Sequence, residues 1–220
     1  MEQKAFNNLS IAAEHIDWSE FLSTVIIEVE KFGKVYTSTA VAIGEKILLT
    51  AAHSVDNMDE ASVFTGSSYR ETIEEIEVER CIIHPNYDPK KSFYKNDIAI
   101  VVLKEKLPTC VKIEELPTSS QYEKGDVFER IGFGGRNKRN RRTWTNPTYS
   151  SRTFDCKSFI LEDEMSVIGD SGGPIFKQSK DGESVELVGI HSTLEGESKT
   201  YIVNLAPYRV WIEANLEIHS

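Results

Sequence analysis

The sequence predicts an all-β protein that ends in one helix. Most apolar runs of the 220-residue chain are short and rich in Val and Ile, as in β-strands. Turn residues recur about every ten positions, a spacing typical of a barrel or a sandwich. The length suits one large β domain or two small ones, with a sizeable core.

Nine runs are expected to form strands. The run IAIVVL at 98–103 is apolar throughout, which predicts a strand buried on both faces. The segment 107–125 is rich in turn residues and is expected to connect two halves. The nine expected strands are 23–29, 39–43, 46–50, 76–83, 98–103, 126–132, 174–176, 185–190 and 200–205.

The helix is expected at 206–219. Apolar residues recur there at helical spacing, and Pro207 suits a first helical turn. The residues that form this apolar stripe are Tyr208, Trp211, Ile212 and Leu216. We therefore expect the C-terminal helix to pack its stripe against a barrel.

Charge and hydropathy argue against two classes of partner. The net charge of −10 disfavours general nucleic-acid binding, which needs basic surface. No apolar run approaches the roughly 20 residues of a membrane-spanning helix. The segment 136–142 is basic, and it is either a solvated loop, a site for acidic partners or a site of proteolysis. We expect neither a nucleic-acid nor a membrane partner.

The spacing of the cysteine and acidic residues gives no indication of a metal site. Cys81, Cys110 and Cys156 allow one disulfide at most, and we expect buried free thiols. None has the spacing of a zinc ligand. The acidic segment 56–75 is expected to be a loop without a recognisable calcium-ligand spacing, so no cofactor is expected either.

The segment GDSGGP at 169–174 is too rich in glycine for a helix or strand. It is either a simple turn or a turn that presents Ser171 outward. In the second case the backbone N–H groups of Gly169 and Ser171 can form an oxyanion hole beside a nucleophile.

A serine nucleophile needs a base, and histidine titrates in the right range. His53 follows the apolar run KILLT, and Asp97 directly precedes the apolar strand at 98–103. A carboxylate at that position is hard to explain as a solvated charge, because its neighbours enter the core. We expect Asp97 to orient the imidazole of His53.

The order His53, Asp97, Ser171 separates one hydrolase architecture from others that use the same residue types. With LLTAAHSV, KNDIAIVVL and GDSGGP, the chain resembles the trypsin/chymotrypsin family of serine peptidases from about residue 11 to 216. RIGFGG and NLAPYRVWI also resemble family segments. The resemblance implies two six-stranded antiparallel β-barrels, at 11–115 and 116–220.

The resemblance also implies an activity. Ser171 would attack peptide bonds of protein or peptide substrates, His53 would act as base and then acid, and Asp97 would stabilise the imidazolium. The enzyme would be a monomer without a cofactor. It would be secreted or periplasmic, although the first 20 residues lack a signal-peptide pattern and the few cysteines would tolerate a reducing compartment. The rivals are a catalytically silent binding module of the same fold and an esterase.

The resemblance places Met165 at the base of the specificity pocket, which excludes selection of Lys or Arg. A shifted alignment would put an acidic residue of 162–164 there instead. Two preferences remain open: an acidic one, read by His191, and an apolar one, shaped by Met165. The implied pocket walls are Ser166, His191, Ser192, Thr193, Leu194 and Thr200.

Family members are activated when a new N-terminal amine pairs with the aspartate before the nucleophile, here Asp170. Ile11 lies 42 residues before His53, close to the family's separation. Cleavage between Ser10 and Ile11 is therefore the expected activation step. The intact chain is expected to be a poorly active zymogen, because a buried aspartate without a cation is unfavourable.

Overall fold

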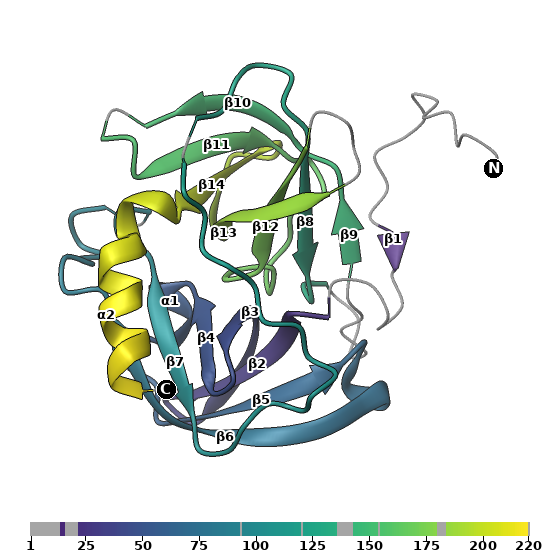
Figure 1. The fold of residues 1–220 in the computed structure, drawn as a ribbon, viewed down its shortest axis with the longest axis vertical. Helices are drawn as coiled ribbons and strands as arrows, with labels where there is room; N and C mark the ends of the chain where they lie inside the picture. The colour runs from purple at the N-terminus through teal and green to yellow at the C-terminus, as the bar shows by residue number, and fades with distance from the viewer. Residues whose placement is uncertain are drawn as a thin grey trace.

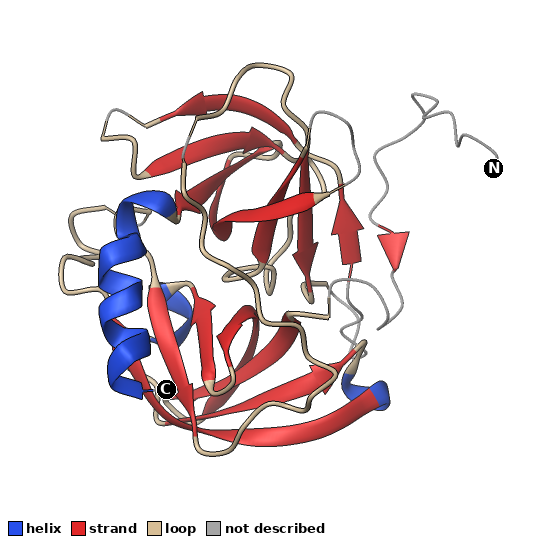
Figure 2. Cartoon of the chain, viewed as in Figure 1, coloured by secondary structure: helices blue, strands red, loops and turns tan. Residues whose placement is uncertain are grey.

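The computed structural model describes residues 14–15, 22–92, 94–119, 121–135, 143–153, 155–179 and 184–219. Within these ranges the chain is nearly all β-sheet, with one longer helix close to its C-terminus (Figures 1 and 2). In Figure 1 the strands form two main groups, one in the lower part and one in the upper part of the view, and the C-terminal helix lies beside the lower group. The all-β prediction is confirmed.

Six strands of the first half close into an antiparallel barrel. Their order around the barrel is β2-β3-β4-β7-β6-β5. The strands are β2 (Thr24–Lys31), β3 (Lys34–Gly44), β4 (Ile47–Thr50), β5 (Glu60–Gly66), β6 (Thr72–Ile83) and β7 (Ala99–Leu103). A short helix α1 (Ala52–Val55) follows β4, and a 3-10 turn (Tyr69–Glu71) precedes β6.

The second sheet has eight strands in the order β1-β9-β8-β12-β13-β14-β11-β10. An isolated bridge between Val127 and Thr148 joins its β8 and β10 ends, so six of its strands form a second barrel. The strands are β1 (Glu14–His15), β8 (Phe128–Gly132), β9 (Thr143–Thr145), β10 (Thr148–Arg152), β11 (Ser158–Glu162), β12 (Pro174–Gln178), β13 (Val185–Glu195) and β14 (Lys199–Asn204). The two six-stranded barrels are confirmed.

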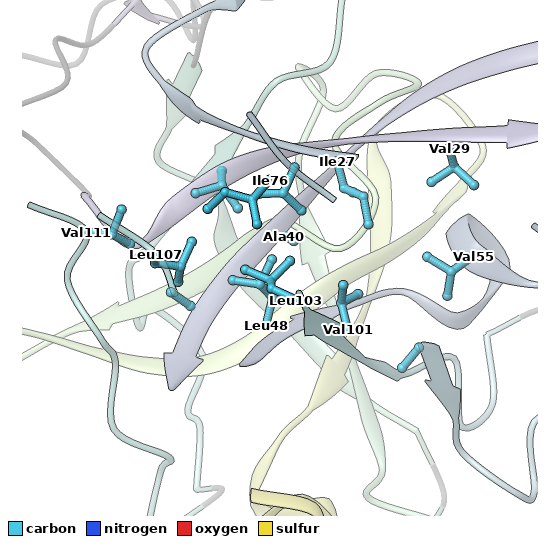
Figure 3. Packing of buried hydrophobic residues seen from close by; sticks show 14 of the residues in the cluster. Ile27, Val29, Ala40, Leu48, Val55, Ile76, Val101, Leu103, Leu107 and Val111 are labelled. Carbon is cyan, nitrogen blue, oxygen red and sulfur yellow. The ribbon is translucent and has the colours of Figure 1, made fainter. Parts of the chain in front are cut away.

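Strand β7 is buried on both faces, as its sequence predicts. Val101 and Leu103 point into the first barrel, where Figure 3 shows them packed with residues such as Leu48. Ile100 and Val102 point the other way, into a cluster shared with the second sheet and the C-terminal helix. This alternation joins the two barrels through one strand.

The C-terminal helix α2 (Arg209–His219) lies beside β7 (Figure 1). Tyr208 and Ile212 are buried in the cluster between the barrels. The helix prediction is confirmed, with one refinement: Pro207 lies in a 3-10 turn (Ala206–Tyr208) that precedes α2.

All nine expected strands are present, and five strands were missed. Strand β5 lies inside the segment 56–75, which was wrongly expected to be a loop. Its residues are mostly polar or small, and only part of it is buried, so its apolar signal is weak. The other missed strands are β1, β9, β10 and β11.

The expected connection between the halves lies between β7 and β8, where the described residues form no strand. The proposed division at 115 and 116 falls there and stays a prediction, although β1 precedes the first barrel and pairs with the second sheet. Ile11 and the basic segment 136–142 lie outside the described residues.

None of the three cysteines forms a disulfide. Cys81 and Cys156 are partly buried, while Cys110 is exposed on the connection between the barrels. The expectation of buried thiols is therefore wrong for Cys110, because the connecting segment runs over the surface.

Candidate active site

Two sheet neighbours bring His53 and Asp97 together. Strands β4 and β7 are antiparallel, with Thr50 opposite Ala99. The residues just after β4 and just before β7 therefore lie at the same end of the barrel. His53 follows β4 in α1, and its Nδ1 lies 2.8 Å from Asp97 Oδ2. The backbone N–H of His53 donates to Asp97 Oδ1 at 2.8 Å.

Asp97 is fully buried, whereas the side chain of His53 is 36% exposed and can be reached by a substrate. The hydroxyl of Ser192 donates to Asp97 Oδ2 at 2.5 Å. A carboxylate fixed by these donors favours the tautomer of His53 that carries its proton on Nδ1. Nε2 is then the acceptor, and it points toward the other barrel.

Ser171 reaches His53 from the second sheet. Its Oγ lies 3.0 Å from His53 Nε2, on the turn between β11 and β12. The first barrel holds this turn, since Thr39 donates from its backbone N to Ser171 O and from its hydroxyl to Gly169 O. Gly172 has a φ of +80°, and a Cβ there would lie 2.3 Å from Thr39 O, so only glycine fits.

The peptides before Gly169 and Ser171 have fixed orientations. Ile168 O accepts from Gly135 N at 3.3 Å, and Asp170 O accepts from Gly173 N at 2.9 Å. In a trans peptide the N–H points away from the preceding C=O. The N–H groups of Gly169 and Ser171 donate to no partner among the described residues. They are therefore available to bind an anionic oxygen beside Ser171.

Asp170 is fully buried and has three partners. Its Oδ1 accepts from Gly134 N, and its Oδ2 accepts from Val167 N, both at 2.9 Å. Arg130 Nη1 lies 2.7 Å from Asp170 Oδ2, and Arg130 Nε donates to Asp163. Burial alone would lower the pKa of Arg130, but Asp170 and Asp163 outweigh it and raise the pKa.

Sequence reasoning missed Arg130, although a signal was present. Arg130 lies on β8 next to Ile131 and two residues after Phe128, and both apolar side chains are fully buried. A charge inside such a strand predicts a buried partner, and the same argument identified Asp97.

Ser166 and His191 are in contact in the predicted pocket. The hydroxyl of Ser166 lies 2.5 Å from His191 Nε2, and both residues are buried. Burial, and next the charge of Arg130, lower the pKa of His191 to about 4. The ring is therefore neutral at neutral pH. His191 Nδ1 and Thr200 Oγ1 have no hydrogen-bond partner in the part of the chain that the structure describes.

The remaining pocket residues take different places. Met165 and Thr193 are partly buried, and Leu194 lies opposite Thr200 across the β13–β14 pair. The hydroxyl of Ser192 is bonded to Asp97 instead of facing a pocket. Asp163, one of the acidic residues that a shifted alignment would offer to the pocket, is buried against Arg130.

The described residues contain no group of three or more His, Cys, Asp or Glu side chains arranged to hold a metal ion. In the same residues, no helix is both long enough and apolar enough to cross a membrane.

Three curated proteins are similar in sequence. The chymase of Rattus norvegicus is 30% identical, over 60% of this chain and 62% of its own length. The complement C1s-1 subcomponent of Mus musculus is 28% identical, over 78% of this chain and 28% of its own. A calcium-dependent serine proteinase of Mesocricetus auratus is 34% identical, over 44% of this chain and 16% of its own. This chain spans less than two thirds of the length of each.

Solved structures show the same fold at low sequence identity. HL collagenase superposes with a TM-score of 0.79 at 18% identity, covering 94% of this chain and 99% of that one. The structure of GrC superposes with a TM-score of 0.80 at 18% identity, covering 94% and 100%. The Trypsin family model matches residues 20–212, which include His53, Asp97 and Ser171. With this match over most of its length, the chain belongs to the trypsin family.

Proposed function

We propose that this protein is a serine endopeptidase that uses Ser171, His53 and Asp97. One observation carries the proposal: a continuous series of contacts runs from Asp97 Oδ2 to His53 Nδ1 at 2.8 Å and from His53 Nε2 to Ser171 Oγ at 3.0 Å. Both distances are within hydrogen-bond reach, as proton transfer requires.

The reaction follows from this geometry. Ser171 Oγ attacks the peptide carbonyl carbon and gives its proton to His53 Nε2. The N–H groups of Gly169 and Ser171 bind the oxyanion of the tetrahedral intermediate. When the peptide C–N bond breaks, the leaving amine takes the proton from His53. Water then attacks the acyl-enzyme, with His53 again as base, and restores Ser171.

The proposed specificity is for an acidic side chain before the scissile bond. If the Ser166 hydroxyl donates to His191 Nε2, the neutral ring carries its proton on Nδ1, which has no described partner. His191 lies opposite Ile202, and Leu194 lies opposite Thr200, so His191 and Thr200 share one face of the sheet. A substrate carboxylate would accept charge-assisted hydrogen bonds from both side chains.

The pocket offers little to a basic side chain. Asp163 is paired with Arg130, and its Oδ1 also accepts from the backbone N of Met165 at 3.1 Å. A carboxylate so occupied does not attract Lys or Arg of a substrate. Met165, at the expected base of the pocket, would instead favour an apolar side chain, and this is the competing outcome.

A fluorophosphonate probe tests the activity. It should label the wild type at Ser171 and leave Ser171→Ala unlabelled. An unlabelled wild type would instead indicate a binding module of the same fold.

A peptide library tests the specificity. Glu should be enriched before the cleaved bond, with Ser171→Ala as the control for background cleavage. Enrichment of Leu, Met or Phe there would reject the acidic preference and leave the peptidase activity standing.

A further inference from the structure

A fully buried arginine lies behind the turn that carries Ser171. Arg130 Nη1 is 2.7 Å from Asp170 Oδ2, and its Nε donates to Asp163. All three side chains are buried. An unpaired carboxylate at such a depth is strongly unfavourable. Arg130 supplies the compensating charge from within strand β8, and a guanidinium stays charged at any working pH.

Asp170 connects this charge to the oxyanion hole through the backbone. Its two oxygens accept from Gly134 N and Val167 N. The residues that directly follow these two are Gly135 and Ile168, and Gly135 N donates to Ile168 O. That bond orients the peptide whose N–H belongs to Gly169.

The backbone is shaped to receive the carboxylate. A Cβ at Gly132 would lie 2.1 Å from Asp170 Oδ1, and one at Gly134 would lie 2.6 Å from it. Both glycines follow Arg130 within four residues. Strand β8 and the residues directly after it therefore supply both the cation and the space that the carboxylate of Asp170 occupies.

We propose that Arg130 is a positioning residue for the oxyanion hole, which makes the intact chain active without a new amino terminus at Ile11. This inference rests on the proposed peptidase function. The cation that fixes Asp170 is part of the fold, so the Gly169 and Ser171 amides are set when the chain folds. Cleavage between Ser10 and Ile11 adds no required interaction.

The first test compares two forms of the protein, one beginning at Met1 and one beginning at Ile11. Mass spectrometry after the assay verifies each N-terminus. The kcat for a peptide ester and for a peptide should differ by less than about tenfold, well short of the 10²–10³ that a lost oxyanion donor costs. A larger advantage of the Ile11 form overturns the inference.

The second test replaces Arg130. Arg130→Met should lower kcat by about 10²–10³ because the oxyanion donors are no longer held, with a much smaller change in KM. Arg130→Lys retains a positive charge and should recover at least about a tenth of the kcat of the wild type. A folded Arg130→Met protein with the kcat of the wild type overturns the inference.

A matched control is Arg209→Met. Arg209 pairs with Glu213 on the surface of α2 and also donates to Leu116 O, so its loss affects stability without touching the site. The kcat of this variant should equal that of the wild type even if its denaturant midpoint is lower. If Arg130→Met does not fold, the comparison of the Met1 and Ile11 forms decides the inference alone.

The outcomes separate this inference from the proposed function. If neither form reacts with the fluorophosphonate or cleaves peptides, the peptidase proposal fails and the inference fails with it. If only the Ile11 form is active, the peptidase proposal stands and the inference alone is overturned.

Discussion

Replacing Thr200 by valine tests whether this buried hydroxyl recognises an acidic substrate. Thr200 is fully buried on β14, and its hydroxyl has no hydrogen-bond partner among the described residues. Valine keeps the shape and removes the hydroxyl, whose unpaired burial costs about 1–3 kcal/mol. We expect the free energy of unfolding to be unchanged or to rise by about 1 kcal/mol, which raises Tm by about 2–4 °C in a chain of this size.

The same substitution should weaken hydrolysis after glutamate. A hydrogen bond to a charged group contributes about 1.5–3 kcal/mol. Since 1.4 kcal/mol corresponds to a factor of ten, kcat/KM for a Glu peptide should fall about 10- to 150-fold. For the matched Leu peptide, kcat/KM should stay within about twofold, because no hydroxyl partner is lost. Paired peptides that differ only before the scissile bond measure the ratio.

Thr24→Val is the matched control for this experiment. Thr24 is also fully buried, and its hydroxyl likewise has no partner in the described ranges, but it lies on β2 of the first barrel. It should shift stability in the same direction and leave the Glu-to-Leu ratio unchanged. An unchanged ratio in Thr200→Val would show that its hydroxyl does not meet the substrate carboxylate, and an equal loss on both peptides would refute a role in selectivity.

Three further predictions concern Asp97, the turn that carries Ser171, and pH. Asp97→Asn should lower kcat about 10⁴-fold with an intact fold, as steady-state kinetics and circular dichroism can verify, because the wrong imidazole tautomer is favoured. Gly172→Ala should lower both kcat and the urea midpoint, since the residue has a φ of +80° and its Cβ would meet Thr39 O at 2.3 Å; an unchanged midpoint contradicts this. Burial and Arg130 lower the pKa of His191 from 6.5 to about 4, so the unfolded chain takes up a proton between those pH values that the native chain does not. Native stability should therefore fall by about 3 kcal/mol as pH drops through this window, and His191→Gln should lose less in urea titrations at pH 7 and 4.5.

Several of the strands that the sequence predicts are buried along their whole length, namely β4, β7 and β8. The run at 98–103 is buried on both faces, so its composition alone identifies it. Strands β9 and β10 are short and mostly polar, and their pairing within the second sheet depends on partners far along the chain. Local composition carries no information on such pairings, so these strands were missed.

The residues of the candidate site also differ in whether the sequence alone reveals them. Asp97 and Ser171 stand out because each breaks the pattern of its own segment. Arg130 breaks its segment in the same manner, but its partner Asp163 lies 33 residues away, and only the folded chain shows the pair. Likewise, the hydrogen bonds from Thr39 to the turn that carries Ser171 cross between the two barrels.

The two buried aspartates of the site are compensated differently, and this difference matches the roles that we propose for them. Asp97 accepts hydrogen bonds from His53 N and the Ser192 hydroxyl, both neutral donors, and its third partner is the His53 ring. In the proposed mechanism its charge is balanced when His53 becomes an imidazolium. Asp170 is paired with Arg130, a cation that it shares with Asp163, and in the proposed mechanism its charge holds backbone in place without responding to the reaction. A cation fixed beside Asp97 in the same way would disfavour a protonated His53, because like charges repel over short distances in a low-dielectric interior. The proposed mechanism therefore needs a permanent cation at Asp170 and none at Asp97.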